Sequence, residues 1–195
     1  TGVAKGAMLT HNNLVANMKQ CHGQFSMALE EGKETAIAPL PLYHIYAFTM
    51  HCMVLLQTGN HSVLIPNPRD MPGFLKTLRN TKFSTFMGLN TLFVGLCKQP
   101  EFKDVDFSNL KLTVSGGMAL TKDAGAAWKS MTGNDICEGF GMTEASPVVT
   151  FNPPGHSKVG SIGLPVASTD CKIVGDDGND LPLGERGELC VKGPQ

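Results

Sequence analysis

The first six residues form a loop whose groups suit a polyphosphate. Residues 1–6 supply a threonine hydroxyl, two glycines and the ammonium group of Lys5. Glycines let backbone N–H groups approach phosphate oxygens, and the lysine adds positive charge. The string lacks the G-x-x-x-x-G-K-[ST] spacing of the common phosphate-binding loop, and an ordinary turn can have the same composition. Alone, the loop is compatible with phosphate binding without establishing it.

Residues 138–144, with the sequence Glu-Gly-Phe-Gly-Met-Thr-Glu, combine an aromatic ring, two glycines, a hydroxyl and two carboxylates. Phe140 could stack on a purine, an interaction worth about 1–3 kcal/mol per base. Thr143 and Glu144 could hold Mg²⁺ beside phosphates, because this ion prefers oxygen ligands. The structural alternative places Phe140 in the core and leaves Glu144 solvated. A dinucleotide-binding fingerprint is disfavoured, because Glu144 occupies the position of its third glycine.

Three further segments are predicted to follow strands and to lie near a ligand. Residues 115–117 (Ser-Gly-Gly) would turn backbone amides toward a crevice, although a plain tight turn has the same residues. Residues 41–46 contain His44, and a lone histidine beside an apolar helix is more often a core or hinge residue than a functional one. Residues 88–92 begin with Gly88, where a missing side chain would admit an acyl chain, with a helix cap as the alternative.

Alternating strand and helix patterns separate these loops. Short apolar strands are predicted over residues 35–40, 61–65, 83–87, 112–115 and 136–140. Helices are predicted over residues 10–25, 45–57, 70–80, 90–99 and 121–128, with Thr10, Asp70 and Thr121 as caps. This alternation implies an α/β fold, in which a mostly parallel sheet is flanked by helices and ligands sit beyond the carboxyl ends of the strands.

The pattern changes after about Pro147, where glycine and proline become frequent and helical periodicity disappears. Strands over residues 169–174 and 188–191 then flank a turn at residues 176–178. We therefore predict an α/β unit over residues 1–150 and a small β-rich segment over residues 151–195. Both ends look cut, because the chain begins inside a loop without an initiator methionine and stops just after a strand.

Composition excludes several classes of function. The 16 basic and 17 acidic residues give a net charge of -1, so no general positive field would attract nucleic acid. The longest apolar stretch, residues 45–56, is shorter than the roughly 20 residues that span a bilayer. The six cysteines are scattered without a C-x-x-C pair, which favours reduced thiols in a cytoplasm over a zinc site. Four histidines are interpreted as structural, namely His22, His51, His61 and His156.

Taken together, the loops at residues 1–6, 41–46, 115–120 and 139–147 occur in the order and spacing that resembles the adenylate-forming (AMP-binding) superfamily of acyl-CoA synthetases. Within it, the segments at residues 68–70, 88–93 and 160–165 look most like bacterial long-chain fatty acid:CoA ligases. The resemblance implies a two-step reaction, in which a fatty carboxylate attacks ATP to give acyl-AMP and the thiol of CoA then takes the acyl group. Neither step needs a protein nucleophile, so positioning and charge stabilisation would carry catalysis.

The resemblance also implies roles for matching residues. Lys5, Thr143, Glu144 and His44 would be the catalytic residues, with Thr143 at the α-phosphate, Glu144 on Mg²⁺ and His44 as a gate beside the carboxylate. Gly88 and Leu89 would lie on the acyl tunnel. The nucleotide would be bound by a larger set, comprising Thr1, Gly2, Lys5, Gly6, Gly116, Gly117, Glu138, Gly139, Phe140, Gly141, Met142 and Thr143. Two positions depart from the family pattern, with Ala4 for a common proline and Phe140 for a common tyrosine.

The sequence therefore predicts a fragment of the large N-terminal domain of an ATP-dependent long-chain fatty acid:CoA ligase. The family's ribose-binding aspartate, its hinge and the lysine of its C-terminal domain are not in this chain, so the fragment alone is expected not to turn over. One alternative is a ligase that passes acyl-AMP to a carrier protein, and another is a non-catalytic nucleotide- or acyl-binding module. The expected partners are small molecules (fatty acid, ATP and CoA), in the cytoplasm or at the periphery of the inner membrane.

Overall fold

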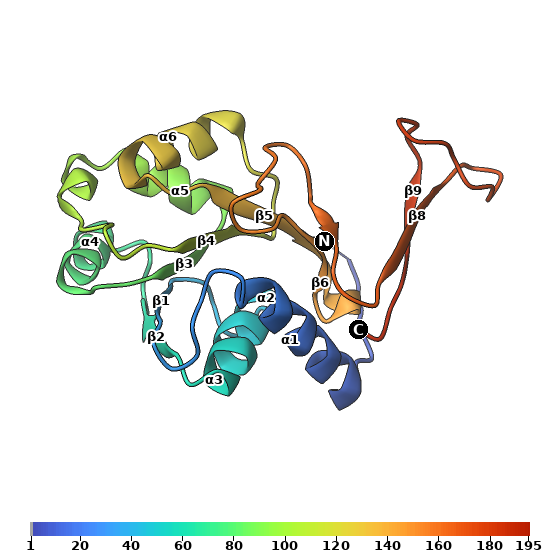
Figure 1. The fold of residues 1–195 in the computed structure, drawn as a ribbon, viewed down its shortest axis with the longest axis horizontal. Helices are drawn as coiled ribbons and strands as arrows, with labels where there is room; N and C mark the ends of the chain where they lie inside the picture. Colours follow the sequence, from blue (N-terminus) through green and yellow to red (C-terminus); the bar gives the residue numbers. More distant parts are fainter. Residues whose placement is uncertain (1) are drawn as a thin grey trace.

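A seven-stranded sheet forms the centre of the computed structural model, which describes residues 2–195 (Figure 1). The strand order is β2-β1-β3-β4-β5-β6-β7. Strands β1 to β5 are parallel, and β6 and β7 each add to the edge in antiparallel fashion. The bounds are Thr35–Ala38 (β1), His61–Leu64 (β2), Thr85–Gly88 (β3), Leu112–Ser115 (β4), Ile136–Gly141 (β5), Val148–Phe151 (β6) and Leu164–Pro165 (β7). The predicted mostly parallel α/β fold is confirmed.

Helices cover both faces of this sheet (Figure 1). One face carries α1 (His11–Phe25), α2 (Ile45–Ala47), η1 (Phe48–Val54) and α3 (Leu55–Gln57). The other face carries α4 (Met71–Asn80), α5 (Asn90–Cys97), η2 (Pro100–Asp104) and α6 (Lys122–Thr132). Within the described part of the chain, no helix is both long and apolar enough to span a bilayer.

The predicted helix caps are confirmed by their hydrogen bonds. Thr10 accepts from the N–H of Asn13 (3.2 Å) and Asp70 accepts from the N–H of Gly73 (3.2 Å). Thr121 caps α6 in the same way, at 3.3 Å from the N–H of Ala124. These short polar side chains satisfy backbone donors that the first helical turn leaves free.

One predicted helix differs in its winding. Residues 45–57 are helical as expected, but the middle of this helix, η1, is a π-helix between the short α-helical pieces α2 and α3. Such a widened segment is uncommon and often lies at functional sites. The apolar periodicity of the sequence indicates a helix here without revealing the wider turn.

Side-chain alternation along the strands divides the core into two layers. Ile37, Phe86 and Ile136 pack toward α4, α5 and α6, where Trp128 lies 5.1 Å from the ring of Phe86. The residues next to them in sequence, such as Met87, pack toward α1 and η1. Because both faces of the central strands β3 and β4 are buried, the middle of the sheet is a rigid platform for the loops at its edges.

The last residues form a separate hairpin. β8 (Asp170–Val174) and β9 (Glu188–Lys192) pair only with each other among the named strands, in antiparallel register. This agrees with the β-rich character predicted after Pro147. Strand β6 crosses residue 150, and a domain boundary there stays a prediction.

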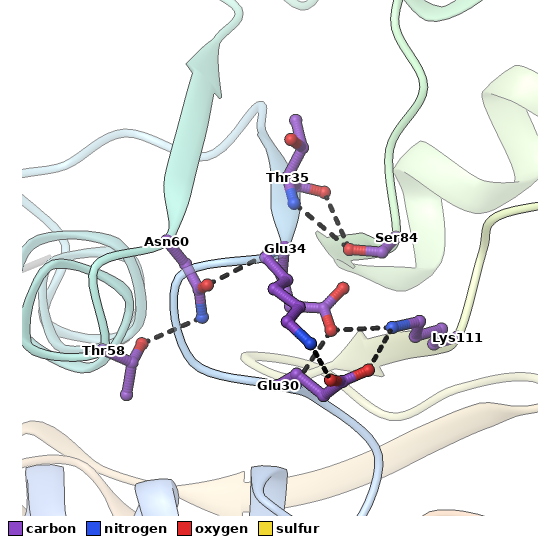
Figure 2. A network of polar contacts seen from close by, with 8 residues as sticks. Glu30, Glu34, Thr35, Thr58, Asn60, Ser84 and Lys111 are labelled. Atoms are coloured by element: carbon purple, nitrogen blue, oxygen red, sulfur yellow. Dashed lines mark hydrogen bonds and ion pairs between the residues drawn. The ribbon is translucent and has the colours of Figure 1, made fainter.

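A polar network joins the amino ends of four parallel strands (Figure 2). Glu34, whose side chain is 1% exposed, precedes β1 and accepts from Lys111 Nζ, which precedes β4, at 2.8 Å. The N–H of Glu34 donates to Asn60 Oδ1 before β2 (3.1 Å). Ser84, before β3, exchanges backbone and hydroxyl hydrogen bonds with Thr35. This edge is held together by side chains from all four strand entries.

Candidate active site

The loop after β4 presents bare backbone. Gly117 has φ +78°, a left-handed conformation that glycine adopts without steric cost. Gly116 is buried, and its N–H donates to the carbonyl of Gly88 at 3.3 Å. The ring of Tyr46 packs directly against Gly116, so a side chain there would have to displace it. This surface therefore admits a flat group against main-chain atoms.

The loop after β5 is a tight turn that carries the predicted phosphate and metal contacts. A Cβ on Gly141 would collide with the carbonyl of Pro147, and the same carbonyl accepts from the N–H of Met142 at 2.9 Å. The short 3-10 turn η3 (Thr143–Ala145) follows. Glu144, within this turn, is exposed. The close backbone approach explains why glycine occupies position 141.

His44 lies where the chain leaves β1 and enters α2. Its Nδ1 accepts from the N–H of Tyr46 at 3.2 Å, so it caps the helix with its side chain. With Nδ1 used as an acceptor, the neutral ring carries its proton on Nε2. The exposed imidazole thus keeps one hydrogen-bond donor for another partner.

Glu138 is a buried carboxylate with one unused oxygen. Its side chain faces the α6 layer, where Oε1 accepts from the N–H of Leu120 at 3.0 Å. Oε2 is buried and has no hydrogen-bond partner within residues 2–195. Ser115, opposite Glu138 in the sheet register, also has a buried hydroxyl oxygen without a partner there. Buried polar atoms are normally paired. These two are not unique in this range, because five further side-chain atoms, Glu34 Oε2 among them, are also buried without a partner.

A cavity of about 180 Å³ lies between the sheet edge and the layer of α1 and η1. Its walls bring together loops that are far apart in sequence. Eight of the predicted site residues line it, namely His44, Gly116, Gly117, Gly139, Phe140, Gly141, Met142 and Thr143. The loops after β1, β4 and β5 therefore converge on one cavity, whose wall includes none of the charged predicted residues Lys5, Glu138 and Glu144.

The remaining cavity wall is largely apolar and uncharged. Cys21, Phe25 and Met50 contribute to it from the helical layer. Burial raises the pKa of the Cys21 thiol to about 12, so it stays protonated at neutral pH. Burial, and then the neighbouring Cys21, raise the pKa of Tyr46, whose hydroxyl donates to the carbonyl of Val114 at 3.4 Å. Neither residue is an activated nucleophile.

The predicted phosphate loop lies apart from this cavity. Thr1 falls outside the described residues. Gly2, Lys5 and Gly6 are exposed in the segment that precedes α1, and none of the three lines the cavity. Their role as phosphate ligands stays a prediction.

Gly88 and Leu89 also lie away from the cavity. Gly88 is buried in the other layer, where a Cβ would lie 2.9 Å from the ring of Phe93. Leu89 precedes α5 without capping it through a side-chain hydrogen bond. Asn90, the first residue of α5, accepts from the N–H and hydroxyl of Thr121 (2.9 and 3.1 Å). The acyl-tunnel role of Gly88 and Leu89 stays a prediction.

Glu144 and Glu138 do not form part of a preassembled metal cluster. Across residues 2–195, no group of three or more histidine, cysteine, aspartate or glutamate side chains is placed to hold a metal ion. A single exposed carboxylate can hold Mg²⁺ when waters and substrate phosphates supply the other ligands. This ion keeps several waters and is commonly shared between one or two carboxylates and substrate phosphates.

Sequence reasoning missed the contribution of α1 to the cavity. Gln24 and Cys21 both line it, and Gln24 Oε1 is buried without a partner in the part of the chain that the structure describes. The available signal was the spacing of amides at positions 13, 17, 20 and 24, which places them on one helical face.

Comparison with known proteins agrees with this geometry. The sequence profile of the AMP-binding enzyme family matches residues 1–195. The long-chain-fatty-acid–CoA ligase of Escherichia coli O6:H1 (strain CFT073) is 48% identical over 198 residues, an alignment that covers 100% of this chain and 35% of the relative. The chain thus spans about a third of the length of this relative.

Solved structures show the same architecture. A long-chain-fatty-acid-CoA ligase from Archaeoglobus fulgidus is 26% identical, with a TM-score of 0.83 over 97% of this chain and 40% of that one. ATP-bound MatB from Rhodopseudomonas palustris is also 26% identical, with a TM-score of 0.84 over 100% of this chain and 38% of that one. The resemblance found in the loops is confirmed by these matches, and the chain belongs to the AMP-binding enzyme family.

Proposed function

We propose that this chain is the part of a long-chain fatty acid:CoA ligase that activates the fatty acid as acyl-AMP. The observation that carries the proposal is the shared cavity, which joins His44, Gly116, Gly117 and Thr143 from three separate strand exits. Ligands of open α/β sheets bind at this edge. The 48% identity to a long-chain-fatty-acid–CoA ligase supports the choice of substrate class.

Adenine would lie against the backbone of the loop after β4, beside Phe140. The flat surface at Gly116 and Gly117 would receive the ring, and Phe140 would stack on it. Binding of ATP by MatB, which has the same fold, agrees with an adenine nucleotide here.

Charge stabilisation would carry the first chemical step. The carboxylate of the fatty acid attacks the α-phosphate and pyrophosphate leaves, so negative charge spreads over the phosphate oxygens. Thr143 would donate a hydrogen bond to the α-phosphate, and Lys5 would neutralise the departing pyrophosphate. Glu144 would hold Mg²⁺, which when bound supplies further neutralising charge. Cys21, kept protonated by burial, takes no part as a nucleophile.

His44 would orient the fatty carboxylate at the mouth of the apolar wall. Its Nε2–H remains available because Nδ1 is occupied by the N–H of Tyr46. Phe25, Met50 and other apolar cavity residues offer a surface for the first methylenes of the acyl chain. The cavity is smaller than the 300–1,000 Å³ typical of complete ligand pockets, which suits a site completed by further parts of a longer protein.

CoA is the proposed acyl acceptor, and we place the reaction in the cytoplasm. The test uses the full-length ligase with palmitate, Mg²⁺ and ATP. Fatty-acid-dependent exchange of pyrophosphate into ATP is expected, followed by thioester formation when CoA is added. If exchange occurs but the thioester forms only on a carrier protein, then the acyl acceptor is the carrier protein and not CoA. Absence of fatty-acid-dependent exchange would refute the proposed function.

A further inference from the structure

The buried face of α1 carries a row of amide side chains. Asn13, Asn17, Gln20 and Gln24 are spaced by three or four residues, so they lie along one side of the helix. The first three reach the backbone of remote segments. Asn13 Nδ2 donates to the carbonyl of Pro194 (2.8 Å), and Gln20 Nε2 donates to the carbonyl of Ala167 (2.6 Å). Burying an amide is costly unless it is hydrogen-bonded. These bonds satisfy Asn13 and Gln20 and also attach α1 to segments that are remote in sequence.

Asn17 binds both main-chain groups of one residue. Its side chain is fully buried, its Oδ1 accepts from the N–H of Val148 (3.0 Å), and its Nδ2 donates to the carbonyl of Val148 (2.8 Å). Nδ2 also donates to Gln20 Oε1 at 2.9 Å, which fixes the orientation of the amide. The Asn17 amide therefore forms with Val148 the same pair of hydrogen bonds that a residue of an adjacent antiparallel strand forms.

Val148 is the first residue of β6, and only Ser146 and Pro147 separate it from the turn that holds Thr143 and Glu144. The rest of this turn is anchored as well. Buried Ser146 has φ +66°, unusual for a residue with a side chain, and its hydroxyl donates to the backbone oxygen of Gln195 (3.1 Å). Thr49 Oγ1, from η1, donates to the carbonyl of Ser146 at 3.3 Å. Asn17 is thus the link between this turn and α1.

We infer that Asn17 is a positioning residue, which sets the turn bearing Thr143 and Glu144 relative to α1 and to the Lys5 loop that precedes that helix. The inference rests on the proposed function. Within residues 2–195, the Asn17 side chain forms hydrogen bonds only with Val148, Gln20 and Cys21, so it acts through the backbone of Val148. Geometry that matters only in the transition state changes kcat, whereas ground-state binding of ATP depends on other loops as well.

The test is Asn17→Asp in the full-length ligase. This isosteric change keeps the acceptor for the N–H of Val148 but places an oxygen opposite its carbonyl. Because a displacement of about 1 Å can cost about 10²-fold, we expect kcat for palmitate-dependent pyrophosphate exchange to fall by about 10- to 100-fold with the KM for ATP unchanged. Asn60→Asp is the matched control, since it makes the same atomic change at a buried amide on the opposite edge of the sheet. Its kcat is expected to stay close to that of the unmodified enzyme.

The outcomes separate the two proposals. An unmodified enzyme without exchange refutes the proposed function. An active enzyme in which Asn17→Asp loses no more kcat than Asn60→Asp, at a temperature where urea titration shows both folded, overturns the positioning role. If Asn17→Asp does not fold, Asn17→Ala decides, because it removes both contacts with Val148 without burying a charge. A fall in kcat at unchanged KM then supports the inference, and an unchanged kcat overturns it.

Discussion

The two edges of the parallel sheet differ in how their buried glutamates are paired. At the amino edge, Glu34 is paired with Lys111 at 2.8 Å and also accepts from the N–H of Glu30 (Figure 2). At the carboxyl edge, Glu138 is also buried but forms no ion pair with any residue in the described range 2–195, and Oε2 of each of the two carboxylates has no hydrogen-bond partner there.

The difference shows how one scaffold separates stability from binding. The strand entries are joined by an ion pair and by hydrogen bonds between side chains. The loops after β4 and β5 are rich in glycine and border a cavity, in whose wall Ser115 Oγ and Gln24 Oε1 have no partner within residues 2–195. An unsatisfied buried acceptor is costly in the empty protein and becomes favourable when a ligand donor arrives. The comparison therefore predicts that changes at one edge affect folding and changes at the other affect activity.

The largest effect is expected at the carboxyl edge. Glu144→Ala in the full-length ligase should lower palmitate-dependent pyrophosphate exchange by about 10²–10³-fold, the usual cost of one charge-stabilising group. The unfolding midpoint should not change, because Glu144 is exposed and pairs with no other residue in the described part of the chain. Glu101→Ala, an exposed glutamate in η2, is the matched control and should leave exchange intact. Unaltered Mg²⁺-dependent exchange in Glu144→Ala would remove this residue from the mechanism.

At the amino edge the effect should appear in stability instead. Glu34→Gln keeps the shape and one acceptor but removes the charge that binds Lys111, and loss of such a hydrogen bond costs about 1.5–3 kcal/mol. Urea titration of the full-length protein measures this loss. The exposed Glu30→Gln serves as a control and should change stability little, since exposed ion pairs contribute weakly. A fall in kcat without a fall in stability would break the contrast between the edges.

Glu138 offers a sharper test at the carboxyl edge. If its free oxygen accepts from the amine of adenine, the unmodified ligase should use ATP about tenfold better than the triphosphate of purine riboside, which lacks that amine. Glu138→Leu should abolish this preference, and ratios of kcat/KM for the two nucleotides measure it. A preference that survives in Glu138→Leu would place the adenine amine elsewhere.

The smallest effect is a pH dependence of stability. Burial raises the pKa of Glu34, but hydrogen bonds led by the one from Lys111 outweigh it, and its net pKa lies below the ordinary 4.5. A depressed pKa in the folded state means that the unfolded chain binds the proton first. The contribution is therefore complete above about 4.5 and is lost as the pH falls through the lowered pKa. Urea midpoints between pH 7 and pH 3 should fall less steeply for Glu34→Gln than for the unmodified protein, and equal slopes would contradict this.

Several features could be predicted from the sequence because they depend on neighbouring residues. Caps at Thr10, Asp70 and Thr121 follow from side chains that reach their own helix. The spacing of apolar residues differs between strands and helices, because it depends on which residues share a face. This spacing was enough to predict the α/β fold. The loops after β4 and β5 were found because glycine at positions such as 117 and 141 marks a local conformation or a close approach.

Other features depended on contacts between distant segments. Asn17 and Val148 are 131 positions apart, and nothing near either one indicates that they meet. The same holds for Gln24 in the cavity wall, and for Gly88, whose neighbours Phe86 and Phe93 place it in the opposite layer. Whether a glycine faces a cavity or a core ring is decided by packing, which its own sequence context does not encode.

By itself, the sequence determined the elements, their alternation and the residue types at each strand exit, because backbone propensity and short-range hydrogen bonds act within a few positions. Only the tertiary structure decided which exits share a cavity, that Glu34 forms an ion pair while Glu138 forms none within residues 2–195, and that α1 contacts β6. Burial and pairing depend on which remote surfaces the sheet brings together, and that is a property of the whole packed chain.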